Sequence, residues 1–223
     1  MSKTVILDVP YWSQLSEIEG SKEHIGLFKR RSCGIISLKM VLDFWYKKSD
    51  SNSSPSVKEL VGLALKENSY SQKDGGWIHD GLVRVAQELG YAAWRRKWIH
   101  NKNEEKFFNS AGLNVKGWQE LKNQTEKEGL SSIFQSLLYG IPVVVSISKN
   151  FNKGSLNSHL IVITGVDELK LEKLECNGFY FNDPYNPISS GQKQRKHRKN
   201  EFIDFKKFID NWNKRAIFII PKK

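Results

Sequence analysis

The chain has 223 residues, of which 39% are hydrophobic and 26% are charged. This length accommodates one or two domains, and the apolar fraction is high enough for a packed core and too high for a disordered chain. No apolar run approaches the ~20 residues that span a bilayer, so we expect no membrane-spanning helix. The presence of only two cysteines, Cys33 and Cys176, excludes a small scaffold held together by several disulfides.

The net charge is +11, from 35 Lys and Arg against 24 Asp and Glu. Such an excess is compatible with nucleic acid, anionic lipid or an acidic substrate as a partner, and equally with solubility alone. Part of the excess is local, because the segment 192–199 (QKQRKHRK) contains five Lys and Arg residues. Since no nucleic-acid motif accompanies this segment, we interpret it as a solvated loop and expect neither nucleic acid nor a membrane as a partner.

The N-terminal half is predicted to be mainly helical after one short strand. The apolar run Val5–Leu7 of that strand is too short for a signal-peptide core, which favours a cytoplasmic protein with reduced cysteines. Apolar residues at helical spacing predict helices over 33–48 and 57–67 and a third that ends at Gly90. The second helix begins with a capping box, formed by Ser56 and by Glu59 three residues later.

The C-terminal half changes from a helical to an extended pattern. A strand is expected over 92–98, and the polar residues 100–130 are interpreted as an insertion with some helix, followed by a helix that ends at Gly140. The spacing of Phe202, Phe205, Phe208 and Ile209 predicts a helix within 201–212. Further strands are expected over 141–147, 159–166, 178–183 and 215–220. Helices followed by a largely antiparallel sheet indicate an α+β fold.

Cys33 is the first candidate for chemistry because it begins the helix predicted over 33–48. Unpaired backbone N–H groups and the positive end of the helix dipole surround a side chain at that position, and both lower a thiol pKa. Arg30 and Arg31 add positive charge, and Gly34 leaves space for a substrate backbone. The structural alternative is a small apolar residue packed at a helix start, as most free cysteines are.

A nucleophilic thiolate needs a proton acceptor, and His159 is the candidate among the five histidines. It begins the strand 159–166, and an antiparallel hairpin with 178–183 places the start of the first strand beside the end of the second. The other four histidines lie in polar stretches or at a predicted helix start: His24, His79, His100 and His197.

We expect a hairpin register that pairs His159 with Asp183 around a loop of residues 166–176. Asp183 then shares a face of the hairpin with His159, whereas alternation sends Asn182 to the other face. The hairpin thus brings a carboxylate to an imidazole. The alternative interpretation is an ordinary histidine at a strand end and an Asp-Pro turn.

An acyl-transfer site also needs a hydrogen-bond donor for the developing oxyanion. Gln14 lies in the loop after the first strand, and its side-chain amide is the candidate, together with the backbone N–H of Cys33. A glutamine at this position would not by itself indicate an active site. It is a candidate only in combination with Cys33, His159 and Asp183.

These residues and their surroundings resemble the C39-like cysteine peptidases, a group with the papain fold. The likeness covers nearly the whole chain except 100–130, and it is carried by VPYWSQ, SCGIISLKMVL, GGWIHDGL, GIPVVVSI, SHLIVITGVD and YFNDP. The resemblance implies that Cys33 is the nucleophile, His159 the base and Asp183 the orienting residue. It also implies that Gln14 is the oxyanion residue. The motif GGWIHDGL places Trp77 as a residue of the substrate groove, with core packing as the alternative.

The chain departs from the family pattern at three points. Ile35 stands where members often have Pro after Cys-Gly, which alters the helix entry but no reacting group. The polar loop Lys149–Asn157 before His159 is long enough to cover the groove. Transporter-linked members of the wider group cleave leader peptides after a double glycine. Since the sequence shows neither a membrane segment nor a Walker A loop, we do not expect cleavage coupled to export in this chain.

Other chemistries have little support in the sequence. It contains no CxxC or HExxH motif, calcium loop or glycine-rich phosphate loop, so we expect neither a metal nor a cofactor. We predict a single α+β domain over 1–223 with a papain-like fold. Cys33 belongs to its helical part, His159 and Asp183 belong to its antiparallel sheet, and the active site lies in the cleft between them.

The predicted activity is that of a cysteine peptidase, which hydrolyses a peptide or amide substrate by thiolate attack and a thioester intermediate. Two alternatives stay open. The first keeps the site but changes the acyl acceptor, as in an amidase, a transglutaminase or another acyltransferase. The second is a non-catalytic binding module on the same fold.

Overall fold

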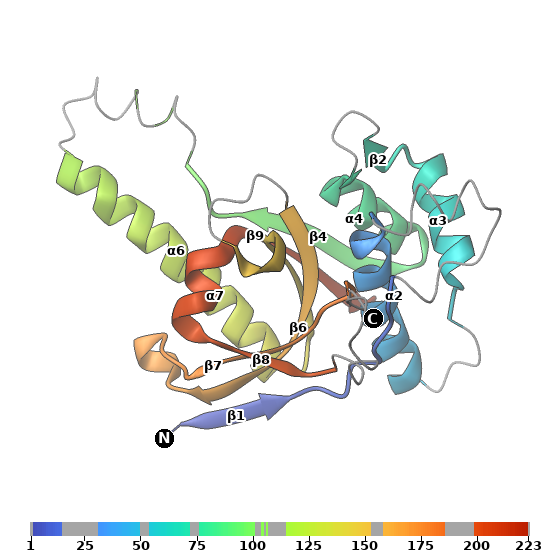
Figure 1. Cartoon of the computed structure of the whole chain (residues 1–223). Coiled ribbons are helices and arrows are strands. Elements are labelled where there is room, and N and C mark those ends of the chain that lie inside the picture. The colour runs from blue at the N-terminus through green and yellow to red at the C-terminus, as the bar shows by residue number, and fades with distance from the viewer. Residues whose placement is uncertain are drawn as a thin grey trace, which may run out of the picture.

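An antiparallel sheet of seven strands runs through the fold (Figure 1). The structure is a computed structural model, and it describes residues 2–14, 31–49, 54–71, 76–100, 104, 106, 115–152, 158–185 and 199–222. The strands follow the order β4 (Tyr91–Lys97), β9 (Trp212–Pro221), β5 (Val143–Ser148), β6 (Ser158–Leu169), β7 (Gly178–Asn182) and β8 (Glu201–Asp204). In addition, β1 (Lys3–Ile6) pairs with the far half of β6. A separate two-stranded sheet joins β2 (Tyr70–Ser71) to β3 (Gly76–Trp77).

The described residues form the helices α2 (Cys33–Lys48), α3 (Val57–Lys66), α4 (His79–Glu88), α6 (Val115–Leu138) and α7 (Phe205–Asn211). The helices α2, α3 and α4 lie where the apolar spacing places them, whereas α6 and α7 differ in part from the predicted helices. The predicted capping box is present, since the Ser56 hydroxyl accepts from the Glu59 N–H at 3.2 Å and the Glu59 carboxylate accepts from the Ser56 N–H at 2.7 Å. Gly90 follows α4 with a φ of 88°, a left-handed conformation that glycine adopts without strain and that ends the helix.

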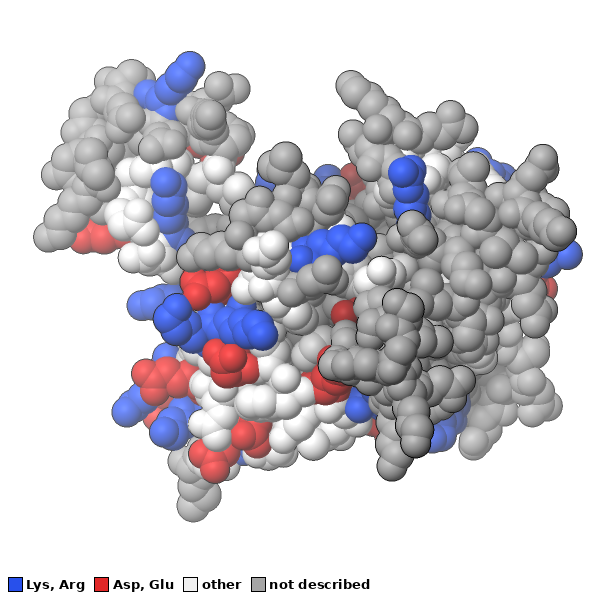
Figure 2. Space-filling view, in the orientation of Figure 1, with Lys and Arg blue, Asp and Glu red and all other residues white. Residues whose placement is uncertain are grey.

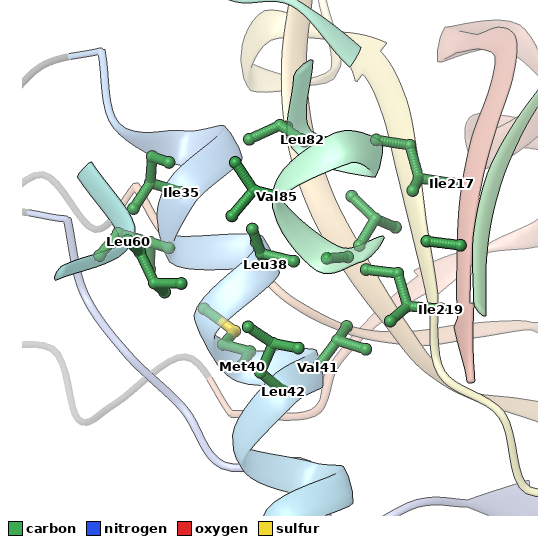
Figure 3. Packing of buried hydrophobic residues seen from close by; sticks show 14 of the residues in the cluster. Ile35, Leu38, Met40, Val41, Leu42, Leu60, Leu82, Val85, Ile217 and Ile219 are labelled. Carbon is green, nitrogen blue, oxygen red and sulfur yellow. The ribbon is translucent and has the colours of Figure 1, made fainter. Parts of the chain in front are cut away.

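The sheet separates two hydrophobic cores. Figure 1 shows α2, α3 and α4 on one side of the sheet and α6 and α7 on the other. Alternation along β6 supplies both cores, because Leu160 and Val162 pack on the α2 side and Ile161 and Ile163 on the α6 side. In the first core, side chains of α2 meet those of α4 and of β9 (Figure 3). The helix α2 therefore packs directly on β6, whose second residue is the candidate base His159.

Residues interpreted as an insertion belong in part to a long helix. From residue 115 onward they form α6, which continues without a break through the helix expected before Gly140. Its inward side chains include Trp118 and Leu130, both buried. Residues 101–103, 105 and 107–114 lie outside the described ranges, and whether 100–130 is an insertion stays a prediction.

The helix predicted within 201–212 begins later than its apolar spacing indicates. Residues 201–204 form β8, and Phe202 is 50% exposed on that strand instead of lying on a buried helical face. Asp204 explains the difference, because its extended backbone and its carboxylate, which accepts from the Lys207 N–H at 2.8 Å, start α7 at the next residue. The prediction was wrong for these four residues.

Charged side chains of both signs are interspersed over the described part of the face in Figure 2. The basic segment 192–199 lies outside the described residues except for Lys199, whose ammonium group pairs with Asp8 at 2.5 Å. In the described ranges, no helix is both long and apolar enough to cross a membrane.

Two helical glycines offer a test of this packing. An added Cβ at Gly62 of α3 meets no atom within 4 Å, whereas one at Gly129 of α6 lies 2.6 Å from the Trp212 ring and 2.9 Å from the Trp98 ring. Gly62→Ala should stabilise the protein by about 1 kcal/mol through helix propensity. Gly129→Ala should destabilise it by about 1–3 kcal/mol through overpacking. Denaturant unfolding measures both, and equal stabilisation by the two substitutions would contradict the described packing of α6.

Candidate active site

Cys33 is the first residue of α2, and among the described residues no side-chain hydrogen bond caps this helix start. Ser32 precedes the helix, but it makes no capping hydrogen bond and its buried hydroxyl has no partner. The N–H groups of the first turn, with the positive end of the helix dipole, therefore stay available to a negative charge at Cys33. The side chain of Cys33 is half-buried, and its thiol is free.

Leu160 of β6 fixes α2 against the sheet beside Cys33. Its backbone N–H donates to the Cys33 sulfur, and its carbonyl accepts from the Ser37 hydroxyl at 3.3 Å. Because Leu160 directly follows His159, the starts of α2 and β6 are joined next to both candidate reacting side chains. Sequence reasoning missed Ser37, although a hydroxyl within an apolar helical stripe was the available signal.

The space expected at Gly34 is filled by the protein itself. Gly34 is buried, and a Cβ added there would lie 2.9 Å from Leu82 and 3.0 Å from Trp77. The missing side chain therefore lets α2 pack closely against neighbouring elements and leaves no room for a substrate backbone. The prediction for Gly34 was wrong because its partners are remote in sequence.

His159 lies between Cys33 and Asp183. Its Nε2 is 2.6 Å from Oδ1 of Asp183, and its ring forms a second hydrogen bond with the Cys33 thiol. Since Asp183 occupies Nε2, the sulfur is bonded by Nδ1. His159 and Asp183 are only 6% and 7% exposed. The three side chains thus form a continuous hydrogen-bonded path, buried at His159 and Asp183 and half-buried at Cys33.

Tyr185 adds two further contacts to this path. Its backbone N–H donates to the same Asp183 oxygen at 2.8 Å. Its ring stands edge-on to the His159 ring, with centroids 6.3 Å apart, and the ammonium group of Lys149 lies 5.2 Å from the Tyr185 ring centroid. Sequence reasoning did not select Tyr185, for which an aromatic residue directly after Asp-Pro was the available signal.

The hairpin register differs by two residues from the expected one. Val162 pairs with Asn182 and Ile163 with Phe181, and the register shifts again before Gly165. Extended by one residue, this register sets Asp183 opposite Ile161 and makes His159 its diagonal neighbour. A shift of two residues keeps every side chain on its face of the sheet, so the carboxylate still reaches the imidazole.

The loop of the hairpin is also shorter than expected. Strand β6 continues to Leu169, and the short helical turn η2 (Leu171–Lys173) follows it. An isolated bridge between Lys170 and Glu175 closes the turn. The expected loop of 166–176 was too long because β6 extends three residues beyond its apolar run, to Leu169.

The electrostatics of the path favour a thiolate and an imidazolium. Burial raises the pKa of the Cys33 thiol, but the hydrogen bond and positive charge of His159, with the Leu160 N–H, outweigh burial and bring the pKa below its ordinary value. For His159, burial lowers the pKa, yet its hydrogen bonds to Asp183 and Cys33 raise that pKa to about 10. Near neutral pH the proton therefore belongs on the imidazole.

Gln14 and Trp77 lie in the immediate surroundings. Gln14 is 1% exposed, and its backbone N–H donates to the carbonyl of Pro184, the residue after Asp183, at 2.9 Å. Its side-chain oxygen is buried without a hydrogen-bond partner. Trp77 is 7% exposed and packs edge-on against Tyr70 with ring centroids 5.1 Å apart. The roles expected for Gln14 and Trp77 stay predictions.

Arg31 is not among the groups that shift the Cys33 pKa. Arg31 is exposed, and its guanidinium lies 3.4 Å from the Tyr70 hydroxyl. The positive charge that lowers the Cys33 pKa is that of His159. Arg30 lies outside the described residues, as do residues 153–157 of the loop expected to cover the groove.

The chain matches a family model, and solved structures are similar to it. The sequence model of the Peptidase_C39 like family matches residues 6–216. A double glycine motif protease from an AMS/PCAT transporter, solved in complex with the leader peptide, is similar over 100% of both chains, with 15% identity and a TM-score of 0.51, which indicates a shared fold. The peptidase domain of Streptococcus ComA, a bifunctional ABC transporter, covers 86% of this chain and 93% of that domain, with 19% identity and a TM-score of 0.47. No curated protein matches the chain.

The pH dependence of alkylation tests the thiolate–imidazolium pair. In the wild type, the rate with iodoacetamide should rise at a pH below the ordinary thiol pKa of about 8.5, because His159 lowers the Cys33 pKa. In His159→Ala, burial and the charge of Asp183 raise the Cys33 pKa and only the Leu160 N–H still lowers it, so the rise should move to a higher pH than in the wild type. Identical profiles for the two proteins would show that His159 does not activate Cys33.

Cys176 provides an internal reference for the same experiment. Burial raises the pKa of this thiol to about 12, so Cys176 should react slowly at neutral pH. Peptide mapping after limited alkylation should find the label on Cys33. Preferential labelling of Cys176 at pH 7 would contradict the described surroundings of both thiols.

Proposed function

Because the chain belongs to the Peptidase_C39 like family and is therefore a cysteine peptidase, we propose that Cys33 is its nucleophile, His159 its general base and acid, and Asp183 the residue that orients His159. The observation that carries this proposal is the hydrogen-bonded path from the Cys33 sulfur through the imidazole to the Asp183 carboxylate. The oxyanion is stabilised by the side-chain amide of Gln14 and the backbone N–H of Cys33. Trp77 contributes to the substrate groove.

The first half of the reaction forms a thioester. The Cys33 thiolate attacks the carbonyl carbon of the scissile amide, and negative charge develops on the carbonyl oxygen. As the tetrahedral intermediate collapses, the carbon–nitrogen bond breaks and the leaving amine takes the proton held on Nδ1 of His159. His159 is then neutral, and Asp183 keeps its ring in place through Nε2.

The second half releases the acyl group. Water attacks the thioester carbon while Nδ1 of His159 takes one of its protons. The carbon–sulfur bond breaks, a carboxylic acid leaves, and the thiolate–imidazolium pair is restored. Formation of the thioester leaves His159 neutral, as a base must be for the attack of water. Hydrolysis of the thioester leaves His159 protonated, as an acid must be for the next leaving amine.

A peptide is the substrate that we propose. A relative of the same fold is a double glycine motif protease that was solved with a leader peptide, so peptides with a Gly-Gly pair before the scissile bond are the first to test. We also propose that the chain acts as one peptidase domain. A cytoplasmic location is supported by the two free cysteines.

Hydrolysis in water enriched in oxygen-18 tests the proposal. Peptides incubated with the enzyme should yield products whose new carboxylate carries one labelled oxygen, as mass spectrometry measures, and Cys33→Ala should yield none. Amine release without incorporation of label would instead indicate transfer of the acyl group to another acceptor. Salt-dependent peptide binding without turnover, retained in Cys33→Ala, would indicate a binding module.

Substitutions of the proposed catalytic residues should lower the hydrolytic activity to different extents. Cys33→Ala should abolish hydrolysis, and Gln14→Ala should lower kcat by about 10²–10³-fold with little change in KM, because the lost donor acts on the oxyanion. Cys176→Ser should retain activity, since its thiol lies away from the path. Turnover by Cys33→Ala at the wild-type rate would refute the proposed nucleophile.

A further inference from the structure

We propose that Trp12 is a positioning residue, whose hydrogen bond to Asp43 holds the segment 7–14 against α2 and so sets the position of Gln14 relative to Cys33. The inference rests on the proposed function, in which Gln14 donates to the oxyanion. Trp12 acts through Gln14, which follows it by two residues in the same loop.

Asp43 is the centre of a polar cluster on α2. The indole N–H of Trp12 donates to Asp43 Oδ2 at 2.6 Å, and the Lys39 ammonium donates to Oδ1 at 2.6 Å. Lys39 also donates to the Ser54 hydroxyl at 2.6 Å, and that hydroxyl donates to Oδ1 of Asp43. The ammonium lies 5.0 Å from the Trp12 ring centroid, within range of a cation–π interaction. Each charged group of the cluster therefore has several partners.

The cluster is buried in a way that stability alone does not explain. The side chains of Lys39 and Asp43 are 8% and 12% exposed, on a helix whose other inward residues are apolar except for Ser37. A buried ion pair contributes little compared with apolar residues of the same size, because desolvation offsets the attraction. The contribution of the pair is instead to fix the position of the side chain that hydrogen-bonds to it. Lys39 neutralises Asp43, and Asp43 holds the indole of Trp12 at one point of α2.

The other side of the segment 7–14 is attached to the hairpin that carries His159 and Asp183. The Leu7 N–H donates to the Thr164 carbonyl at 2.7 Å, and the Gln14 N–H donates to the Pro184 carbonyl at 2.9 Å. The side-chain amide of Asn182 donates to the Val9 carbonyl at 3.3 Å.

Trp12 connects this segment to the opposite side of the site. Cys33 and Asp43 belong to one helix and lie roughly 15 Å apart along it at 1.5 Å per residue. The segment is thus attached both to the hairpin of the base and to the helix of the nucleophile. An exposed ion pair between Asp8 and Lys47 adds a second link to α2, with side chains 65% and 66% exposed, where solvent weakens its effect.

Loss of the contact between Trp12 and Asp43 should affect one part of the reaction only. Loss of the Trp12 hydrogen bond frees the loop to shift relative to α2, and a misplacement of about 1 Å can lower a rate by about 10²-fold. Only steps that develop an oxyanion should be affected. Alkylation of Cys33 by iodoacetamide displaces iodide at a saturated carbon and develops none, so it should keep its rate.

Trp12→Phe tests the proposal because it retains an aromatic ring for Lys39 and removes the N–H. We expect kcat to fall by about 10–100-fold, with KM and the iodoacetamide rate unchanged. Trp45→Phe is the matched control, since Trp45 lies on α2 and donates its indole N–H at 2.9 Å to the Ile219 carbonyl, away from the segment 7–14. It should keep the wild-type kcat while losing a comparable hydrogen bond.

A double-mutant cycle with Gln14→Ala separates positioning from general destabilisation. If Trp12 acts through Gln14, Trp12→Phe should cause no further loss of kcat in the Gln14→Ala background. Additive losses, or equal kcat values for Trp12→Phe and Trp45→Phe, would overturn the proposal while leaving the peptidase intact. Absence of Cys33-dependent hydrolysis in the wild type would instead overturn the proposed function on which it rests.

Discussion

The junction between α2 and β6 at Leu160 is the contact on which the active site depends. One residue binds the helix with both of its backbone groups, through its N–H to the Cys33 sulfur and through its carbonyl to the Ser37 hydroxyl. Its own position is fixed by the sheet, where it pairs with Ser146 of β5. The distance between thiol and imidazole is therefore set by backbone geometry, which varies less than the packing of free side chains and suits a site that needs sub-ångström placement.

Cys33 and His159 could be selected as candidates from the sequence because Cys33 begins α2 and His159 lies at the start of β6. The signals that mark such starts are local, as the capping box of α3 also illustrates. The register of the hairpin between β6 and β7, in contrast, is not marked by local signals. It depends on the irregularity before Gly165 and on the true length of β6, which no local pattern specifies. Asp183 was nevertheless chosen correctly as the partner of His159, because an error of two residues preserves the face of a strand.

Other features escaped prediction because their partners lie far away in the sequence. Gly34 is enclosed by Leu82 and Trp77 of the α4 region, and Ser54, outside α2, reaches the pair of Lys39 and Asp43. In each case the residue type fits several environments, and only the packing of whole elements selects one. The same holds for the Trp12 hydrogen bond, since an indole N–H seeks a partner that the sequence does not identify.

The starts of α2 and α3 differ in a way that favours a negative charge at Cys33. A serine precedes both α2 and α3, but Ser56 has an extended backbone and caps its helix, whereas Ser32, with φ −92° and ψ 12°, does not. A cap stabilises a helix by about 1 kcal/mol, yet its oxygen would occupy N–H groups that a thiolate at Cys33 uses. Thiolate, imidazolium and the Asp183 carboxylate together leave one buried negative charge, which requires donors. The Leu160 and Tyr185 N–H groups supply two of them, and the positive end of the α2 dipole lies beside Cys33.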